Sequence, residues 1–383
     1  MTSHGPALIY DKSTLQGLTE EEAHWLHHHF HCVLTPTIYH EVLADLKKSP
    51  REGKTPEEEV AAIAKKVPSY AFTPNMYFRD LVMEDFMTGP VEMTGRPYLG
   101  RGKKVKHPDG STAVFFDVTP EAKAFGLWSD AKFDEMEHLA AGEWRNGLAA
   151  IDLKHRRKSF SWMKDPLKGL KKDTELLDFI DKALMLDPYR MLLMAIQYFQ
   201  VPNQYHNEIV NRWIRTGGKP LSQHIPYVSH ILKVDMFFTF LLVKGFISDG
   251  RSTDLIDFTY FYYLPFCLVF SSEDNLHRKY APMLIGKHQK FVEGSFLKKG
   301  LGELVSYYAG LPAEVRSRGY SSYAQYPPLD RPFIISSIYD DCCGYDWRSY
   351  ANEPESPRDP ETDKKTLEGV KEWLSLRDQQ HQT

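Results

Sequence analysis

The sequence predicts an α/β protein with a central parallel sheet, because two short apolar runs far apart in the chain each end in an acid. Residues 7–11 read Ala-Leu-Ile-Tyr-Asp, and residues 267–274 read Cys-Leu-Val-Phe-Ser-Ser-Glu-Asp. Apolar runs of about four to eight residues between polar residues are typical of buried parallel strands. Reactive groups in open α/β sheets lie just beyond the carboxyl ends of such strands. The two acids are therefore expected at one edge of the sheet.

The first fifty residues predict two strand–helix units. After the strand at residues 7–11, Thr19 and Glu22 have the spacing of a capping box that opens a helix. A second strand is expected at residues 32–35. Pro36 then stands near the start of a second helix, where its missing N–H does no harm. Parallel pairing is the default for two strands that are joined by a helix.

The middle of the chain predicts a mostly helical insertion into this α/β domain. Asp109-Gly110 is a strong turn signal for a hairpin within residues 103–116. A strand at residues 267–270 belongs to the second half of the domain. Helices are expected at residues 54–66, 119–148, 173–186, 188–200, 204–214, 229–246, 255–263, 291–308 and 364–376. The expected segments are 1–49 and 226–300 for the two halves of the α/β domain, 50–225 for the insertion and 301–383 for a C-terminal extension.

Charge and cysteine usage indicate a soluble protein of a reducing compartment. The 383 residues carry a net charge of −4, which argues against nucleic-acid binding over the whole surface but allows a local basic groove. The four cysteines show neither zinc-ligand spacing nor a disulfide framework. The N-terminus lacks the pattern of a secretion signal, and the apolar stretch at 234–246 is too short for a bilayer. We expect a cytoplasmic protein without a membrane partner.

Five acids are candidates for a divalent-metal site. Phosphodiester hydrolysis with Mg²⁺ or Mn²⁺ needs several carboxylates around the ion, which activates water and stabilises charge on the phosphate. Asp11 and Asp274 end the two strands, and Glu41 stands on the helix after the second strand. Asp257 lies on the helix before the last strand. Asp254, three residues earlier, shares a helical face with Asp257, although its place at a helix start also suits a simple cap.

The order of these motifs resembles that of PIN (PilT N-terminal) domains, a family of nucleases. The matching elements are Leu8-Ile-Tyr-Asp11, residues 33–41 ending in Glu41, Asp254-Leu-Ile-Asp257, and residues 268–274 ending in Asp274. The spacing from either Asp254 or Asp257 to Asp274 fits the family, and Asp257 is the first choice. The match covers roughly residues 7–48 and 227–282, and it is nearer to uncharacterised bacterial PIN-like proteins than to small toxins.

The resemblance implies a three-layer α/β/α fold and a metal-dependent endonuclease that acts on nucleic acid, with RNA preferred to DNA as the expected substrate. It also implies that the catalytic residues are the four acids that hold one or two Mg²⁺ or Mn²⁺ ions, namely Asp11, Glu41, Asp257 and Asp274. The insertion would select the substrate or bind a protein partner, and a homo-oligomer is compatible with this arrangement.

Two rival functions are also compatible with the sequence. A non-catalytic interaction module with a PIN fold would show no divalent-metal binding that Asp11→Asn abolishes. A metal-dependent phosphatase on a doubly wound sheet would hydrolyse phosphomonoesters and leave oligonucleotides intact. The sequence has neither a glycine-rich phosphate loop nor a nucleophile elbow, which weakens the phosphatase interpretation.

Other patterns favour structural interpretations. The histidines within residues 24–31 are expected on the surface of an amphipathic helix, since only pairs four apart share a face. Asp235, inside an apolar helix, is expected to be a buried acid with partners. The aromatic run at 260–266 is expected in the core. The lysines at 103–106 and the basic run at 154–158 are ordinary charged faces that become candidates for phosphate contacts if the protein is a nuclease.

Overall fold

The computed structural model describes residues 5–50, 53–68, 72–99, 103–106, 112–115, 119–344 and 346–352, together with residues 368 and 371. The expected hairpin is present as strands β4 (Lys103–Lys106) and β5 (Thr112–Phe115), which pair antiparallel. Its Asp109-Gly110 turn lies outside the described residues. The same holds for nearly all of the helix expected at 364–376.

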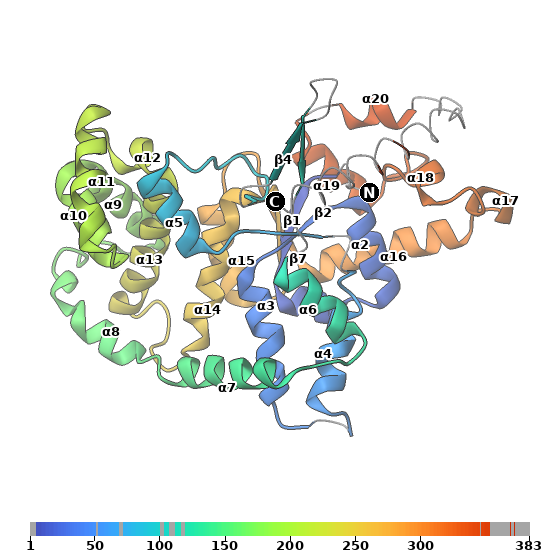
Figure 1. The fold of residues 1–383 in the computed structure, drawn as a ribbon, viewed down its shortest axis with the longest axis horizontal. Helices are drawn as coiled ribbons and strands as arrows, with labels where there is room; N and C mark the ends of the chain where they lie inside the picture. Colours follow the sequence, from blue (N-terminus) through green and yellow to red (C-terminus); the bar gives the residue numbers. More distant parts are fainter. Residues whose placement is uncertain are drawn as a thin grey trace.

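A five-stranded parallel sheet forms the centre of the protein, as predicted (Figure 1). Its strand order is β3-β2-β1-β6-β7. The strands are β1 (Ala7–Tyr10), β2 (His31–Leu34), β3 (Phe72–Pro74), β6 (Val269–Ser272) and β7 (Lys290–Glu293). In the register, Leu8 pairs with Cys32 of β2 and with Val269 of β6. The strand predicted at 267–270 begins later because the Cys267 N–H still bonds to Leu264 O at the end of a 3-10 helix.

Helices flank the sheet and complete the predicted three-layer α/β/α architecture. The capping box of Thr19 and Glu22 is present at the start of α2. In the first half of the chain the helices are α1 (Lys12–Gly17), α2 (Glu20–His29), α3 (Pro36–Leu43), η1 (Ala44–Lys47), α4 (Pro56–Ala64), α5 (Phe78–Met87), α6 (Pro120–Ser129), α7 (Glu135–Ala149), α8 (Leu153–Ser159), η2 (Ser161–Lys164) and α9 (Asp173–Leu186). The remaining helices are α10 (Pro188–Tyr198), α11 (Asn203–Arg215), α12 (Leu221–His224), α13 (Pro226–Lys244), α14 (Thr253–Thr259), η3 (Tyr260–Phe266), α15 (Asn275–Leu284), α16 (Gly294–Ala309), α17 (Ala313–Arg316), α18 (Tyr320–Tyr323), α19 (Ile334–Cys342) and α20 (Trp347–Asn352).

The limits expected at residues 50 and 300 do not coincide with breaks in the packing. Strand β3 lies within the expected insertion, yet it pairs with β2 at the edge of the central sheet. Helix α16 runs through residue 300 and packs on α2 and α19. The sequence did not indicate β3 or β7, because these strands of three and four residues are only partly buried and lack a continuous apolar run. The helix expected at 119–148 is divided into α6 and α7, where Ala131 adopts a positive φ of 55°.

Helices α8–α13 gather on one side of the sheet around the long helix α13 (Figure 1). By length and composition α13 is able to cross a membrane, but 78% of its apolar window is buried inside the structure. Burial of this kind is typical of the core helix of a soluble protein. The sequence expectation that no apolar segment is long enough to span a bilayer is corrected, since α13 has 19 residues, yet its surroundings are protein.

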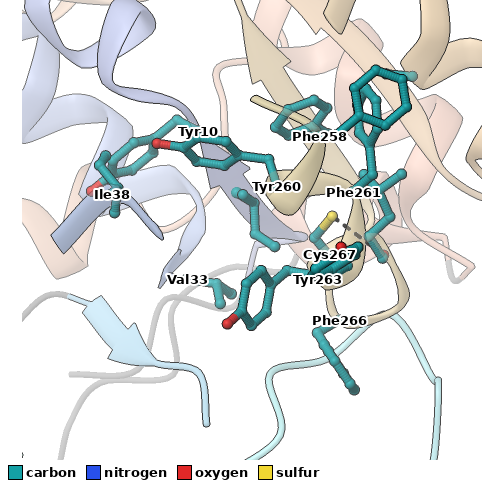
Figure 2. Close-up of a cluster of buried hydrophobic side chains, with 14 of the residues drawn as sticks. Tyr10, Val33, Ile38, Phe258, Tyr260, Phe261, Tyr263, Phe266 and Cys267 are labelled. Atoms are coloured by element: carbon teal, nitrogen blue, oxygen red, sulfur yellow. Dashed lines mark hydrogen bonds between the residues drawn. The ribbon is translucent and has the colours of Figure 1, made fainter. Parts of the chain in front are cut away.

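Aromatic side chains fill the space between the sheet and η3, as expected. Figure 2 shows Tyr10 of β1 and Ile38 of α3 beside Tyr260 of η3. All three side chains are at most 1% exposed. Tyr263 lies in the same cluster, and its hydroxyl accepts a hydrogen bond from the Phe78 N–H at the start of α5. This core fixes η3, and with it the preceding helix α14, against the strands.

Candidate functional site

Three neighbouring parallel strands, β2, β1 and β6, bring the predicted acids to one edge of the sheet. Asp11 follows β1, Glu41 lies on α3 after β2, and Asp274 follows β6. The chain adds β2 and β3 on one side of β1, whereas β6 and β7 lie on the other side. Ligands of open α/β sheets bind beyond the carboxyl ends of the strands, at the point where the strand order reverses. Asp11 and Asp274 flank that point.

Asp11 is buried and is held by several donors. It caps α1, and its Oδ1 accepts the Thr14 N–H at 2.9 Å. Ser13 Oγ lies 2.8 and 2.7 Å from its two carboxylate oxygens, and Ser272 Oγ donates to its Oδ2 at 2.6 Å. Burial alone would raise the pKa of Asp11, but His277, Ser272 and the Thr14 N–H lower it. Asp11 is therefore an ionised anchor of the site whose oxygens already have partners.

His277 of α15 is the main partner of Asp11 and is almost completely buried. Its Nδ1 lies 2.8 Å from Ser272 Oγ and 3.5 Å from Asp11 Oδ2, and its Nε2 lies 2.8 Å from the backbone oxygen of Asp257. Burial alone would lower the pKa of His277, but Asp11 and then Asp257 raise it. A protonated His277 can donate from both ring nitrogens, and so it joins β1, β6 and α14 beneath the site.

Glu41 reaches the same region from α3 and accepts a hydrogen bond from the Tyr260 hydroxyl. Burial raises the pKa of Glu41, although Tyr260 and the positive charge of Lys12 oppose that shift. Lys12 donates to the backbone oxygen of Glu41 at 3.1 Å and forms an ion pair of 2.6 Å with Asp45. The end of α3 is thereby tied to the start of α1, which keeps Glu41 close to Asp11.

Asp257 of α14 differs from these acids because its Oδ2 is buried without a hydrogen-bond partner among the described residues. Burial, together with the charges of Asp274 and Glu41, raises the pKa of Asp257 to about 7, although the charge of His277 lowers it. An unpaired buried carboxylate oxygen costs free energy that a bound cation would recover. Asp257 is therefore the acid with the clearest unmet requirement for a positive partner.

Arg251 supplies positive charge where Asp254 and Asp274 approach each other. Its Nε lies 3.0 Å from Asp254 Oδ1, and its Nη2 lies 3.7 Å from Asp274 Oδ2. Burial raises the pKa of Asp254, and the charge of Asp274 adds to this effect while Arg251 opposes it. Asp274 also caps α15, where its Oδ1 accepts the Leu276 N–H at 2.7 Å. The Arg251 side chain is 63% exposed, so it can exchange partners at little cost.

The acids form one electrostatically connected group rather than a closed metal cage. Asp257 responds to the charges of Glu41 and Asp274, and Glu41 responds to that of Asp11. Within the described residues, no three His, Cys, Asp or Glu side chains are arranged to hold a metal ion. Magnesium often uses only one or two carboxylates, with waters and substrate phosphates as its other ligands. The oxygen donors and the orphaned Asp257 Oδ2 fit such an open site.

Sequence reasoning missed the residues that support the acids. Ser272 and His277 flank Asp274 in the sequence. A hydroxyl at the end of a buried strand could have indicated that Ser272 supports the site. Tyr260 was correctly expected in the core, but its bond to Glu41 was not anticipated. Asp254 lies in the first turn of α14, as expected for an acid at a helix start, although the N-cap residue itself is Ser252.

The other polar patterns have structural roles, and one expectation is corrected. His27 and His29 are buried, not on the surface, because α2 packs on two sides: the His27 ring lies against Tyr10 of β1 and the His29 ring against Tyr308 of α16. His29 stacks on Trp25 and Tyr308. Asp235 is a buried acid with partners, as expected, and it accepts hydrogen bonds from Arg156 and two tyrosines, Tyr198 and Tyr262.

Comparison of the chain with protein-family models, with curated proteins and with solved structures finds no match. The resemblance to PIN domains therefore stays a prediction from the sequence. Support for a function comes from the residues of the candidate site.

Proposed function

We propose that this protein is a metal-dependent endonuclease that hydrolyses phosphodiester bonds, with RNA as the first-choice substrate. The observation that carries the proposal is the buried, unpaired Oδ2 of Asp257 among further acids at the carboxyl edge of the sheet. Burial and neighbouring acids raise the pKa of Asp257 to about 7, and a bound cation would offset both effects. The preference for RNA rests on the resemblance to PIN domains.

Asp257 and Asp274 would hold Mg²⁺ or Mn²⁺, and the remaining predicted acids, Asp11, Glu41 and Asp254, would surround it. When bound, the ion would lower the pKa of a water and stabilise charge on the phosphate. The buried Asp11–His277 pair keeps the ends of β1 and β6 in position. The exposed Arg251 is suited to binding a substrate phosphate, since a guanidinium matches phosphate geometry. A cytoplasmic location fits the cysteines, all four of which are free.

The proposal predicts that purified protein cleaves labelled single-stranded RNA in the presence of Mn²⁺ and that Asp257→Asn slows cleavage by at least about a hundredfold. The change keeps the size of the side chain and removes its charge. Asp178→Asn on α9 is the matched control, because Asp178 is exposed and far from the site in sequence. Single-turnover rates on RNA, DNA and a phosphomonoester would be compared.

Equal rates for the wild type and Asp257→Asn would remove Asp257 from the mechanism. Turnover of the phosphomonoester without oligonucleotide cleavage would favour the phosphatase instead. A protein that binds nucleic acid but cleaves none of the substrates would favour the interaction module.

A further inference from the structure

Residues 153–172 form the most basic segment of this length among the described residues. They include eight lysines and arginines and one acid, Asp165, in a protein whose overall net charge is −4. The segment comprises α8, η2 and the turns that lead into α9. Its charge therefore contrasts with that of the whole protein, and a local positive surface of this kind attracts polyanions.

Only part of this basic segment has a structural role. Arg156 forms an ion pair with Asp235 at 2.5 Å, and Arg157 forms one with Asp249 at 3.1 Å. Leu153, Met163 and Leu167 are buried, and Lys244 donates to the Leu167 carbonyl at 3.0 Å. The backbone of the segment is thus fixed to α13. Within the run at residues 154–158, which the sequence predicts as an ordinary charged face, Arg156 and Arg157 are therefore engaged by acids of the protein itself.

The side chains that remain on the outside are lysines interleaved with two aromatic rings. Trp162 is 67% exposed and Phe160 is 36% exposed. The exposed lysines form no ion pair with any described residue. We name this group the lysine–aromatic surface, and its residues are Lys154, Lys158, Phe160, Trp162, Lys164 and Lys168. Because about two thirds of Trp162 is exposed, its ring is available to a ligand.

Two ion pairs connect the segment around this surface to the candidate active site. Arg157 bonds to Asp249, which stands two residues before Arg251, and Arg251 contacts Asp254 and Asp274. Lys279 of α15 forms an ion pair of 2.7 Å with Asp173 at the start of α9. One ion pair thus joins the segment to the turn before α14, and the other joins the residue directly after the segment to α15.

We propose that the lysine–aromatic surface binds single-stranded nucleic acid and guides the strand to the acids. The delivery of the strand to the acids rests on the proposed nuclease function. The binding itself can occur without cleavage. Lysines neutralise the backbone phosphates, and bases stack on Trp162 and Phe160 in a manner that tolerates any sequence. Exposed rings select single strands, because the bases of a duplex are already stacked on one another.

A membrane surface is the main competitor for a basic surface with aromatic residues. A membrane-binding helix needs a continuous apolar face that is free to enter the lipid. Here Leu153, Met163 and Leu167 point into the core and leave only two rings outside. The observations therefore favour nucleic acid.

The test measures binding without metal, by fluorescence anisotropy of a labelled oligouridylate of about 12 nucleotides in EDTA. Trp162→Ala should raise the Kd about tenfold, and Trp162→Phe should restore most of the affinity. The double variant Lys164→Glu/Lys168→Glu should weaken binding and reduce the slope of log K against log salt by about 0.7 for each lysine in contact. An oligothymidylate and a duplex serve as comparison ligands, and the duplex should bind more weakly.

The controls are Lys299→Glu and Phe296→Ala on α16. Lys299 is exposed, and Phe296 is 45% exposed. Figure 1 shows α8 and α16 on opposite sides of the molecule. The controls should bind like the wild type. Unchanged binding by all surface variants would overturn the proposal, as would capture of the wild type by vesicles of phosphatidylcholine and phosphatidylserine without oligonucleotide binding. If the variants lose binding but the wild type cleaves no substrate, the lysine–aromatic surface binds nucleic acid and the proposed nuclease function is rejected.

Discussion

Two aspartates with buried carboxylate oxygens, Asp85 and Asp257, have nearly the same raised pKa but different surroundings. Burial raises the pKa of each to about 7. Asp85 accepts the Val91 N–H at 2.8 Å and the Val228 N–H at 2.9 Å, so both of its oxygens are used. Asp257 leaves its Oδ2 without a partner, and its neighbours include two further acids. A raised pKa alone therefore does not identify a functional acid, because the partners decide its role.

The region around Asp85 is a structural joint. Val228 lies in the first turn of α13, so Asp85 caps that helix from the end of α5, where a negative charge meets the helix dipole favourably. Among the described residues, no comparable set of donors surrounds the Asp257 carboxylate. The Asp85 carboxylate therefore stabilises the fold through two hydrogen bonds, whereas one buried oxygen of Asp257 has no hydrogen-bond partner among the described residues.

The largest expected difference between these regions is in stability. Asp85→Ala leaves two buried N–H groups unpaired and should lower the free energy of unfolding by about 2 to 4 kcal/mol. Asp257→Ala removes an unpaired carboxylate near other acids, and it should change the free energy of unfolding by less than about 1 kcal/mol or increase it. Urea denaturation without metal measures both values. If Asp257→Ala lowers the free energy of unfolding more than Asp85→Ala does, Asp257 has a structural role and the contrast between the two aspartates is wrong.

A smaller effect is expected in the dependence of stability on pH. Because both aspartates bind protons more tightly in the folded than in the unfolded chain, the free energy of unfolding should fall as pH rises from about 4 to about 7. Asp11 contributes in the opposite direction. Because its pKa is lowered in the folded chain, its ionised form adds to the free energy of unfolding, and this contribution is lost only in stronger acid. Asp257→Asn should make the decline from pH 4 to 7 shallower. Parallel curves for this variant and the wild type would contradict the raised pKa of Asp257.

The sequence predicts the fold better than it predicts the site. Strands β1 and β2 follow from continuous apolar runs, and the acids after β1 and β6 follow from the rule for strand ends. The partly buried strands β3 and β7 carry no such signal. The supporting role of His277 depends on a contact between α15 and Asp11 at the end of β1, and no local sequence pattern encodes that contact.

The same limit applies to charge. The basic run at residues 154–158 continues to residue 172, and the whole stretch holds eight lysine and arginine residues. The sequence does not reveal that Arg156 and Arg157 form ion pairs with Asp235 and Asp249. Which basic residues remain outside depends on where Asp235 and Asp249 are placed by the fold. The local sequence therefore identifies charged segments, and tertiary contacts decide which of those charges are available to a ligand.

Calorimetric titration with Mn²⁺ at about pH 8, where Asp257 is ionised, tests the central claim most directly. The account predicts saturable binding by the wild type, loss of that binding in Asp257→Asn, and no change in Asp85→Asn. Equal heats of binding in the wild type and Asp257→Asn, or no binding by the wild type, would contradict it.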